Sequence, residues 1–78
     1  MRMTQVDALS RNINRLREEA GLSQALFGER FGMSQSTVSR KLHGQIPFSA
    51  TEIAECAEYF NVSLDLLYSR EGLKKDKY

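Results

Sequence analysis

The sequence predicts an all-α fold of five short helices. Apolar residues recur at helical spacings of three and four, serines stand where helices should begin, and glycines stand where they should end. No stretch shows the alternation expected of a strand. With 78 residues and a hydrophobic content of 41%, the chain can form one small core. We expect a single domain over residues 1–70 and a charged tail over residues 71–78.

The first helix is expected to begin at Thr4, with Asp7 three residues later in a capping-box pattern. Gly21 is its expected end, because glycine adopts positive φ without a Cβ clash. The predicted apolar face of this helix consists of Val6, Leu9, Ile13, Leu16 and Ala20.

Two short helices joined by a tight turn are predicted next. Ser23 caps the second helix, which runs to Phe31 and stops at Gly32. Ser34 caps the third helix, which runs to about His43. Gly44 is its stop signal, and its predicted inner side carries Met33, Val38 and Leu42.

Two further helices complete the predicted bundle. Ser49 and Glu52 form a capping box for the fourth helix, which Asn61 ends, and Ser63 caps a short fifth helix. The residues expected to face the core are Ile53, Cys56, Ala57 and Phe60 in the fourth helix and Leu64, Leu67 and Tyr68 in the fifth. Phe27, Phe31, Phe48 and Tyr59 are also expected to pack in the core or at its edge.

The third helix has the composition of a helix that enters the major groove of DNA. It carries small polar and basic residues and no acid between residues 35 and 43. Gln35 can pair with adenine, Arg40 with guanine, and the methyl group of Thr37 can touch a thymine methyl. Ser36 and His43 lie on the same outer side, while Ser34 and Ser39 are small enough for the backbone to approach phosphates. Gln24 can add a phosphate contact at the start of the second helix.

Charge is distributed unevenly, although the formal net charge is only +1. Residues 11–43 hold six basic residues and three acids, whereas residues 44–73 hold one basic residue and five acids. One part of the molecule can therefore face phosphates while another faces away.

Other kinds of site find less support in the sequence. One cysteine cannot form an internal disulfide, and the single histidine has no cysteine or second histidine near it for a metal site. A redox role for Cys56 remains a minor alternative to core packing. Since no nucleophile is paired with a base, we expect no enzymatic activity, no cofactor and no metal. We also find no apolar run long enough for a membrane span and no secretion signal, so a cytoplasmic protein is expected.

The chain resembles the Cro/C1-type (XRE-like) helix-turn-helix family, which includes phage repressors of the lambda type. The resemblance covers residues 12–68 and rests on the segments LREEAGLSQ (16–24), FGERFGMSQSTVSRKLHG (27–44) and NVSLDLLY (61–68). It implies a five-helix, lambda-repressor-like domain that binds operator DNA as a dimer through its third helix. Gln24 matches a phosphate-clamping glutamine. Gln35, Ser36 and Arg40 match base-contacting positions, and His43 matches a phosphate-contacting asparagine.

The sequence departs from the family pattern at several positions. Gly28 replaces a usual alanine between the second and third helices, and Leu26 stands where relatives often carry glutamate. Lys41 stands at a usually apolar position, so we expect its stem along the core edge and its amine at a phosphate. Leu42 replaces a glutamate that would pair with the arginine matching Arg17, which leaves the partner of Arg17 open.

The expected function is that of a homodimeric, sequence-specific transcription regulator of phage-repressor type, associated with the nucleoid, with an inverted-repeat operator and no small-molecule ligand. Phe48, Leu64, Tyr68 and the tail are the expected dimer surface. Two alternatives stay open: a protein-binding adaptor on the same scaffold and an excisionase-like architectural DNA-binding protein.

Overall fold

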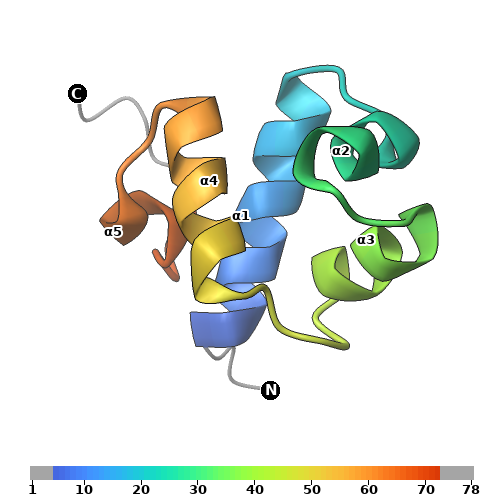
Figure 1. Ribbon diagram of the computed structural model, residues 1–78. Helices are drawn as coiled ribbons and strands as arrows, with labels where there is room; N and C mark the ends of the chain where they lie inside the picture. The colour runs from blue at the N-terminus through green and yellow to red at the C-terminus, as the bar shows by residue number, and fades with distance from the viewer. Residues whose placement is uncertain (1–4, 73–78) are drawn as a thin grey trace.

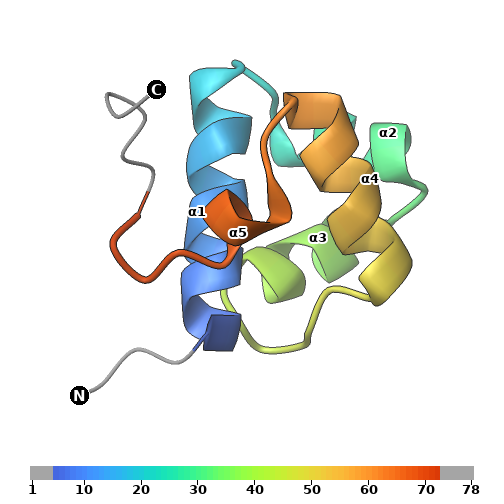
Figure 2. The same cartoon turned by 90° about the vertical axis from the view of Figure 1, so that its left-hand side faces the viewer.

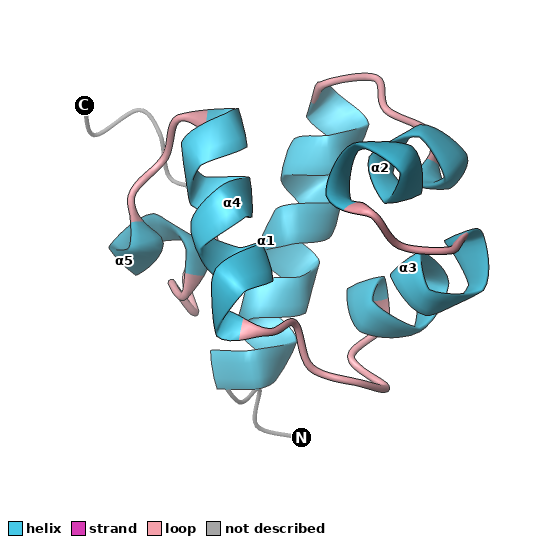
Figure 3. Ribbon diagram, viewed as in Figure 1, coloured by secondary structure: helices cyan, strands magenta, loops and turns pink. Residues whose placement is uncertain are grey.

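Five helices make up most of residues 5–72, the part of the chain that the computed structural model describes (Figure 1). No strand occurs within this part (Figure 3), so the predicted all-α class is confirmed. The helices are α1 (Gln5–Glu19), α2 (Gln24–Phe31), α3 (Gln35–Leu42), α4 (Ala50–Phe60) and α5 (Leu64–Leu67).

Serine caps start four of these helices at the predicted positions. Ser23, Ser34, Ser49 and Ser63 each have extended backbone angles and accept a hydrogen bond from the backbone N–H three residues later. Each cap satisfies one of the N–H groups that the first helical turn leaves without a partner. At α4 the full capping box forms with Glu52, as predicted. The predicted cap of α1 at Thr4 lies outside the described residues.

The helix ends also follow the sequence signals closely. Gly32 ends α2 at φ 73°, and Asn61 ends α4 at φ 57°, both in the left-handed region that releases the chain from the helix. Helix α3 ends at Leu42, one residue before the predicted end, because His43 takes the capping position with φ −93°.

The core lies where α1 meets the other helices. The fully buried or nearly buried apolar side chains are Ala8, Leu9, Ile13, Leu16, Phe27, Val38, Leu42, Phe48, Ile53, Cys56 and Leu67. Met33, Phe31, Ala57, Phe60 and Tyr68 are partly buried against this cluster. Most of the predicted inner faces are therefore confirmed.

For two residues the prediction of a core position is wrong. Ala20 is exposed because α1 ends at Glu19, so the helical periodicity no longer places residue 20 over the core. Leu64 is 50% exposed because it begins a helix of four residues, in which Leu67 alone is buried. The side chain of Val6, also predicted to face inward, lies outside the described part.

Helix α1 contacts both α3 and α5, and α2 and α4 also meet each other where the ring centres of Phe31 and Tyr59 are 5.6 Å apart. Figure 1 shows α2 and α3 on one side of α1 and α4 and α5 on the other, and Figure 2 shows α5 beside α1. Helix α3 packs on α1 and α2, whereas α5 packs on α1 and α4. This arrangement leaves the outer face of α3 on the side of the molecule away from α4 and α5 (Figure 1).

Buried polar contacts of α1 hold its neighbours in place. The Nδ2 group of Asn12, whose side chain is buried, donates to the carbonyl oxygens of Leu67 (2.8 Å) and Ser69 (2.9 Å) at the end of α5. The Nε and Nη2 groups of Arg17 donate to Oδ1 of Asn14 at 3.1 and 2.9 Å, and its Nη1 donates to the carbonyl of Leu22. Arg17 thus stabilises the turn that leads into α2.

Candidate nucleic-acid interface

Helix α3 is anchored by one face and exposed on the other. Val38 and Leu42, one helical turn apart, are buried in the core with 0% and 5% exposure. The opposite face carries Ser36, Arg40 and His43, which are all exposed, flanked by the half-buried side chains of Thr37 and Ser39, while Gln35 is exposed in the first turn. The predicted base-contacting residues are thus all open to solvent, Ser36 and Arg40 on one face and Gln35 at the start of the helix.

The first turn of α3 is fixed by its own hydroxyl groups. Ser34 Oγ accepts a hydrogen bond from the backbone N–H of Thr37 at 3.2 Å and donates to Thr37 Oγ1 at 3.0 Å. The hydroxyl hydrogen of Ser34 is therefore used within the cap, while Thr37 keeps its own hydroxyl hydrogen for another acceptor. Gln35 and Ser36 follow directly, so the cap sets the positions of two predicted base-reading side chains.

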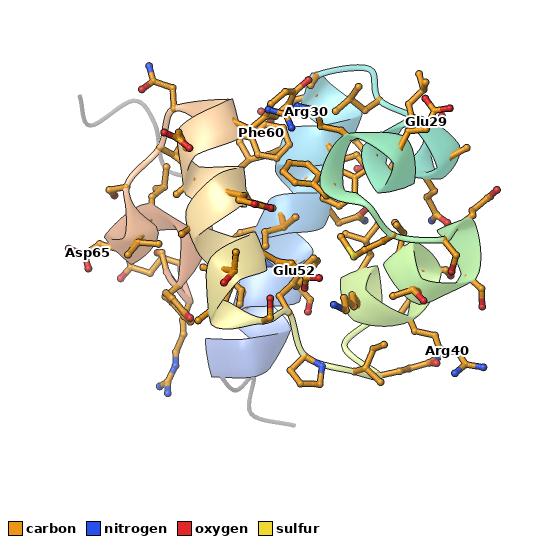
Figure 4. The ribbon with its side chains drawn as sticks, viewed as in Figure 1. Glu29, Arg30, Arg40, Glu52, Phe60 and Asp65 are labelled. Atoms are coloured by element: carbon orange, nitrogen blue, oxygen red, sulfur yellow. The ribbon has the colours of Figure 1, made fainter. Side chains whose placement is uncertain are left out.

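The last turn of α3 carries the remaining polar groups. A ring nitrogen of His43, Nδ1, lies 2.7 Å from the carbonyl oxygen of Ser39. Since a carbonyl oxygen only accepts, Nδ1 carries the hydrogen and Nε2 is left for an outside partner. Arg40 points away from the body of the molecule (Figure 4) and makes no described hydrogen bond or ion pair.

The N-terminal end of α2 offers a second candidate contact to the phosphate backbone. Gln24 is the first residue of α2, directly after the Ser23 cap, and its side chain is half-buried. The N-terminal ends of α2 and α3 lie at the same side of the molecule, on the right in Figure 1. Backbone N–H groups at two helix starts can thus approach one phosphate strand.

The structure places Lys41 differently from its predicted position at a phosphate. Its Nζ forms an ion pair with Oε1 of Glu52 in α4 at 2.5 Å, and the two side chains are only 12% and 19% exposed. Residue 41 lies three positions after the buried Val38, so its side chain leaves the helix toward Glu52 of α4 and not toward the exposed face. Lys41 is therefore not brought together with the other candidate residues.

Most of the other basic side chains are also engaged within the protein. Arg15 pairs with Glu19, Arg17 bonds Asn14, and Arg11 donates to carbonyl oxygens at Ser69 and Arg70. The guanidinium carbon of Arg30 lies 4.9 Å from the ring centre of Tyr59 and 5.4 Å from that of Phe31. Within residues 11–43, Arg40 is thus the basic side chain directed at solvent without a described partner.

The buried thiol of Cys56 has the properties of a core residue. It is 0% exposed, and burial, with the carboxylates of Glu52 and Glu55, raises its pKa to about 12. The neutral thiol is the unreactive form, so this environment disfavours redox chemistry. Within the described residues, no group of three or more His, Cys, Asp and Glu side chains could hold a metal ion. None of the described helices has the length and apolar composition needed to cross a membrane.

Comparison with known proteins agrees with this geometry. The helix-turn-helix domain family matches residues 8–68, which include all five helices except the first turn of α1. Neither the curated proteins nor the solved structures contain a significant match to the chain. The family match covers most of the sequence. The chain therefore belongs to the family of helix-turn-helix DNA-binding domains.

Proposed function

We propose that this protein is a sequence-specific transcription regulator of the Cro/C1 type that inserts α3 into the major groove of duplex DNA. One observation carries the proposal: α3 presents an exposed face of polar and basic side chains without an acid, while Val38 and Leu42 hold its other face in the core. Such a face offers donors and acceptors to base edges and repels no phosphate.

Each exposed side chain has a role in this proposal. Gln35 and Arg40 read bases through paired hydrogen bonds, with Ser36 and Thr37 beside them. Gln24 contacts a phosphate, His43 does so through Nε2 when both of its ring nitrogens carry a hydrogen, and the backbone approaches phosphates at Ser34 and Ser39. The function is binding without catalysis, cofactor or small-molecule ligand, as in repressors of phage and prophage origin.

The proposed binding unit is a homodimer on an inverted repeat. Half-sites about 34 Å apart, one turn of DNA, would place two copies of α3 in successive major grooves on one side of the duplex. Leu64, which is 50% exposed, and the half-buried Tyr68 are available for the dimer surface. Phe48, also expected there, is only 6% exposed and belongs to the core of its own chain.

Selection of bound sequences from a random duplex library tests the proposal at near-physiological salt, where non-specific phosphate binding is weak. We expect enrichment of an inverted repeat. The double variant Gln35→Ala, Arg40→Ala should lose this preference. Arg70→Ala removes an equal charge near α5, away from α3, and should keep it.

Two other results would replace the proposal. Enrichment of a single unpaired motif, with bending of the bound duplex, would indicate an architectural protein. No enrichment would indicate a protein-binding adaptor, for which the 51% exposed Leu26 on α2 is the favourable observation.

A further inference from the structure

We infer that the ion pair between Lys41 and Glu52 positions the recognition helix: it fixes the last turn of α3 against the start of α4 and so sets the direction of Arg40 and His43. This inference rests on the proposed function. It assigns Lys41, a basic residue within the recognition helix, a role other than phosphate contact.

The pair is built into the start of α4. Oε1 of Glu52 accepts a hydrogen bond from Nζ of Lys41 and a second one, at 2.9 Å, from the backbone N–H of Ser49. Ser49 Oγ accepts in turn from the N–H of Glu52 at 3.1 Å. One carboxylate oxygen therefore closes the capping box and binds the recognition helix at the same time.

The surroundings of the pair withdraw it from solvent. Nζ of Lys41 lies 5.9 Å from the ring centre of Phe48, whose side chain is buried. Phe48 belongs to the connection between α3 and α4, so Lys41 contacts both the connection and the helix that follows it. A lysine in this setting is a poor phosphate ligand, because reaching a phosphate would leave the carboxylate of Glu52 without its cation.

The pair also bridges two helices that otherwise have few contacts. Helix α3 packs on α1 and α2, and it is not among the helices that pack closely on α4. Apart from the buried Leu42, the end of α3 is held by local hydrogen bonds, from the N–H of Gln45 to the carbonyl of Arg40 and from the N–H of Gly44 to that of Lys41. The Lys41–Glu52 pair is thus the polar contact that relates the last turn of α3 to α4.

Three variants test the inference on the full chain: Lys41→Met, Glu52→Gln and the double variant. Methionine keeps the length of the lysine stem, and glutamine keeps an oxygen for the N–H of Ser49. Affinity for the selected operator and for a random duplex is measured over a range of salt concentrations. Circular dichroism fixes a temperature at which every variant is fully folded, so that a loss of fold does not enter the comparison.

We expect each single variant to bind the operator about tenfold more weakly, and the double variant to bind about as weakly as the singles, because they remove one shared contact. Random-duplex affinity and the salt slope should stay unchanged, whereas Arg40→Gln, at a base-reading position, should lower the preference for the operator over the random duplex. If the ion pair only stabilised the fold, the variants, measured while folded, would keep the ratio of operator affinity to random-duplex affinity.

The alternative role of Lys41, a phosphate contact, predicts different changes in affinity and in salt slope. If Lys41 contacts a phosphate, Lys41→Met lowers the salt slope by about one and weakens binding to both duplexes, while Glu52→Gln releases the ammonium and strengthens binding. Those results, or operator affinities unchanged in all three variants, overturn the inference and leave the proposed function intact. A wild-type protein that shows no preference for any duplex overturns the proposed function instead.

Discussion

At the scale of single residues, the amide of Asn12 connects the first helix to the last. Its Nδ2 group donates to carbonyl oxygens at the end of α5, where helix carbonyls lack partners within the helix. The side chain is 1% exposed, and its bond to the carbonyl oxygen of Leu67 is buried. Asn12 therefore completes the hydrogen bonding of α5 from another element.

We expect Asn12→Ala to lower the free energy of unfolding by about 1–3 kcal/mol, because it leaves the buried carbonyl oxygen of Leu67 without a hydrogen bond, whereas that of Ser69 keeps its bond from Arg11. Denaturant unfolding measures this loss. Ser10→Ala is the matched control on the same helix: Ser10 is 3% exposed and its Oγ has no hydrogen-bond partner, so this variant should keep or raise the stability. Equal losses in the two variants would contradict the assigned role of Asn12.

The sequence predicts local contacts of single residues better than distant ones. Each serine cap depends on a residue three positions away, so spacing alone identified it. Lys41 and Glu52 are 11 positions apart, and Asn12 and Leu67 are 55 apart. Such pairs depend on how helices pack, which helical periodicity does not specify, and Lys41 was accordingly predicted to face a phosphate.

At the scale of elements, Gly28 determines how closely the turn between α2 and α3 approaches α2. A Cβ at this position would lie 2.4 Å from the carbonyl oxygen of Met33 in the turn and 3.3 Å from Cγ2 of Val38 in α3. The same glycine carbonyl accepts the N–H of Met33 at 2.8 Å. An alanine at this position therefore requires the turn to move away from α2.

Gly28→Ala should destabilise the fold by about 1–3 kcal/mol through overpacking, even though alanine favours a helix by about 1 kcal/mol over glycine. Thermal and denaturant unfolding measure the net change. Ala25→Gly, at an exposed position of the same helix, measures how much the helix propensity of alanine over glycine contributes to stability without overpacking. A gain in stability for Gly28→Ala would show that the turn moves aside at little cost.

Helix faces are predicted well in long helices and poorly at their ends. In α1, Leu9, Ile13 and Leu16 repeat over more than one turn, and all three are buried. Leu64 begins a helix of four residues, which is too short to define a face from periodicity. The sequence therefore predicts that each helix exists and where it starts. Whether a residue at a helix end is buried depends on how the helices pack, which the sequence pattern does not show.

At the scale of the whole molecule, the formal charge of residues 11–43 overstates the number of cationic side chains that are unengaged and available to phosphates. Arg11, Arg15, Arg17 and Lys41 all hold partners within the protein, and Arg30 is stacked on two aromatic rings. Few cations are therefore left to bind phosphates non-specifically. The interface is suited to specificity through side-chain hydrogen bonds more than to strong electrostatic attraction.

The ion pair that joins α3 to α4 also links the stability of the whole domain to pH. Burial by itself raises the pKa of Glu52, but hydrogen bonds from Lys41 and from the backbone N–H of Ser49, with the charge of Lys41, outweigh it and leave the pKa below its ordinary value. A lowered pKa in the folded state means that the ionised carboxylate contributes stability above its unfolded pKa.

This contribution must be lost as the pH falls from about 4.5 through the folded pKa of Glu52, because the folded protein then has to take up the proton that the unfolded chain already holds. We expect Glu52→Gln to be less stable than the wild type near neutral pH and the difference to shrink on acidification, since protonated Glu52 is as neutral as glutamine. Denaturant unfolding across this pH range measures the difference, with the exposed Glu58→Gln on the same helix as control. A difference that stays constant down to about pH 3 would show that glutamine disturbs α4 through shape and not through the loss of its charge.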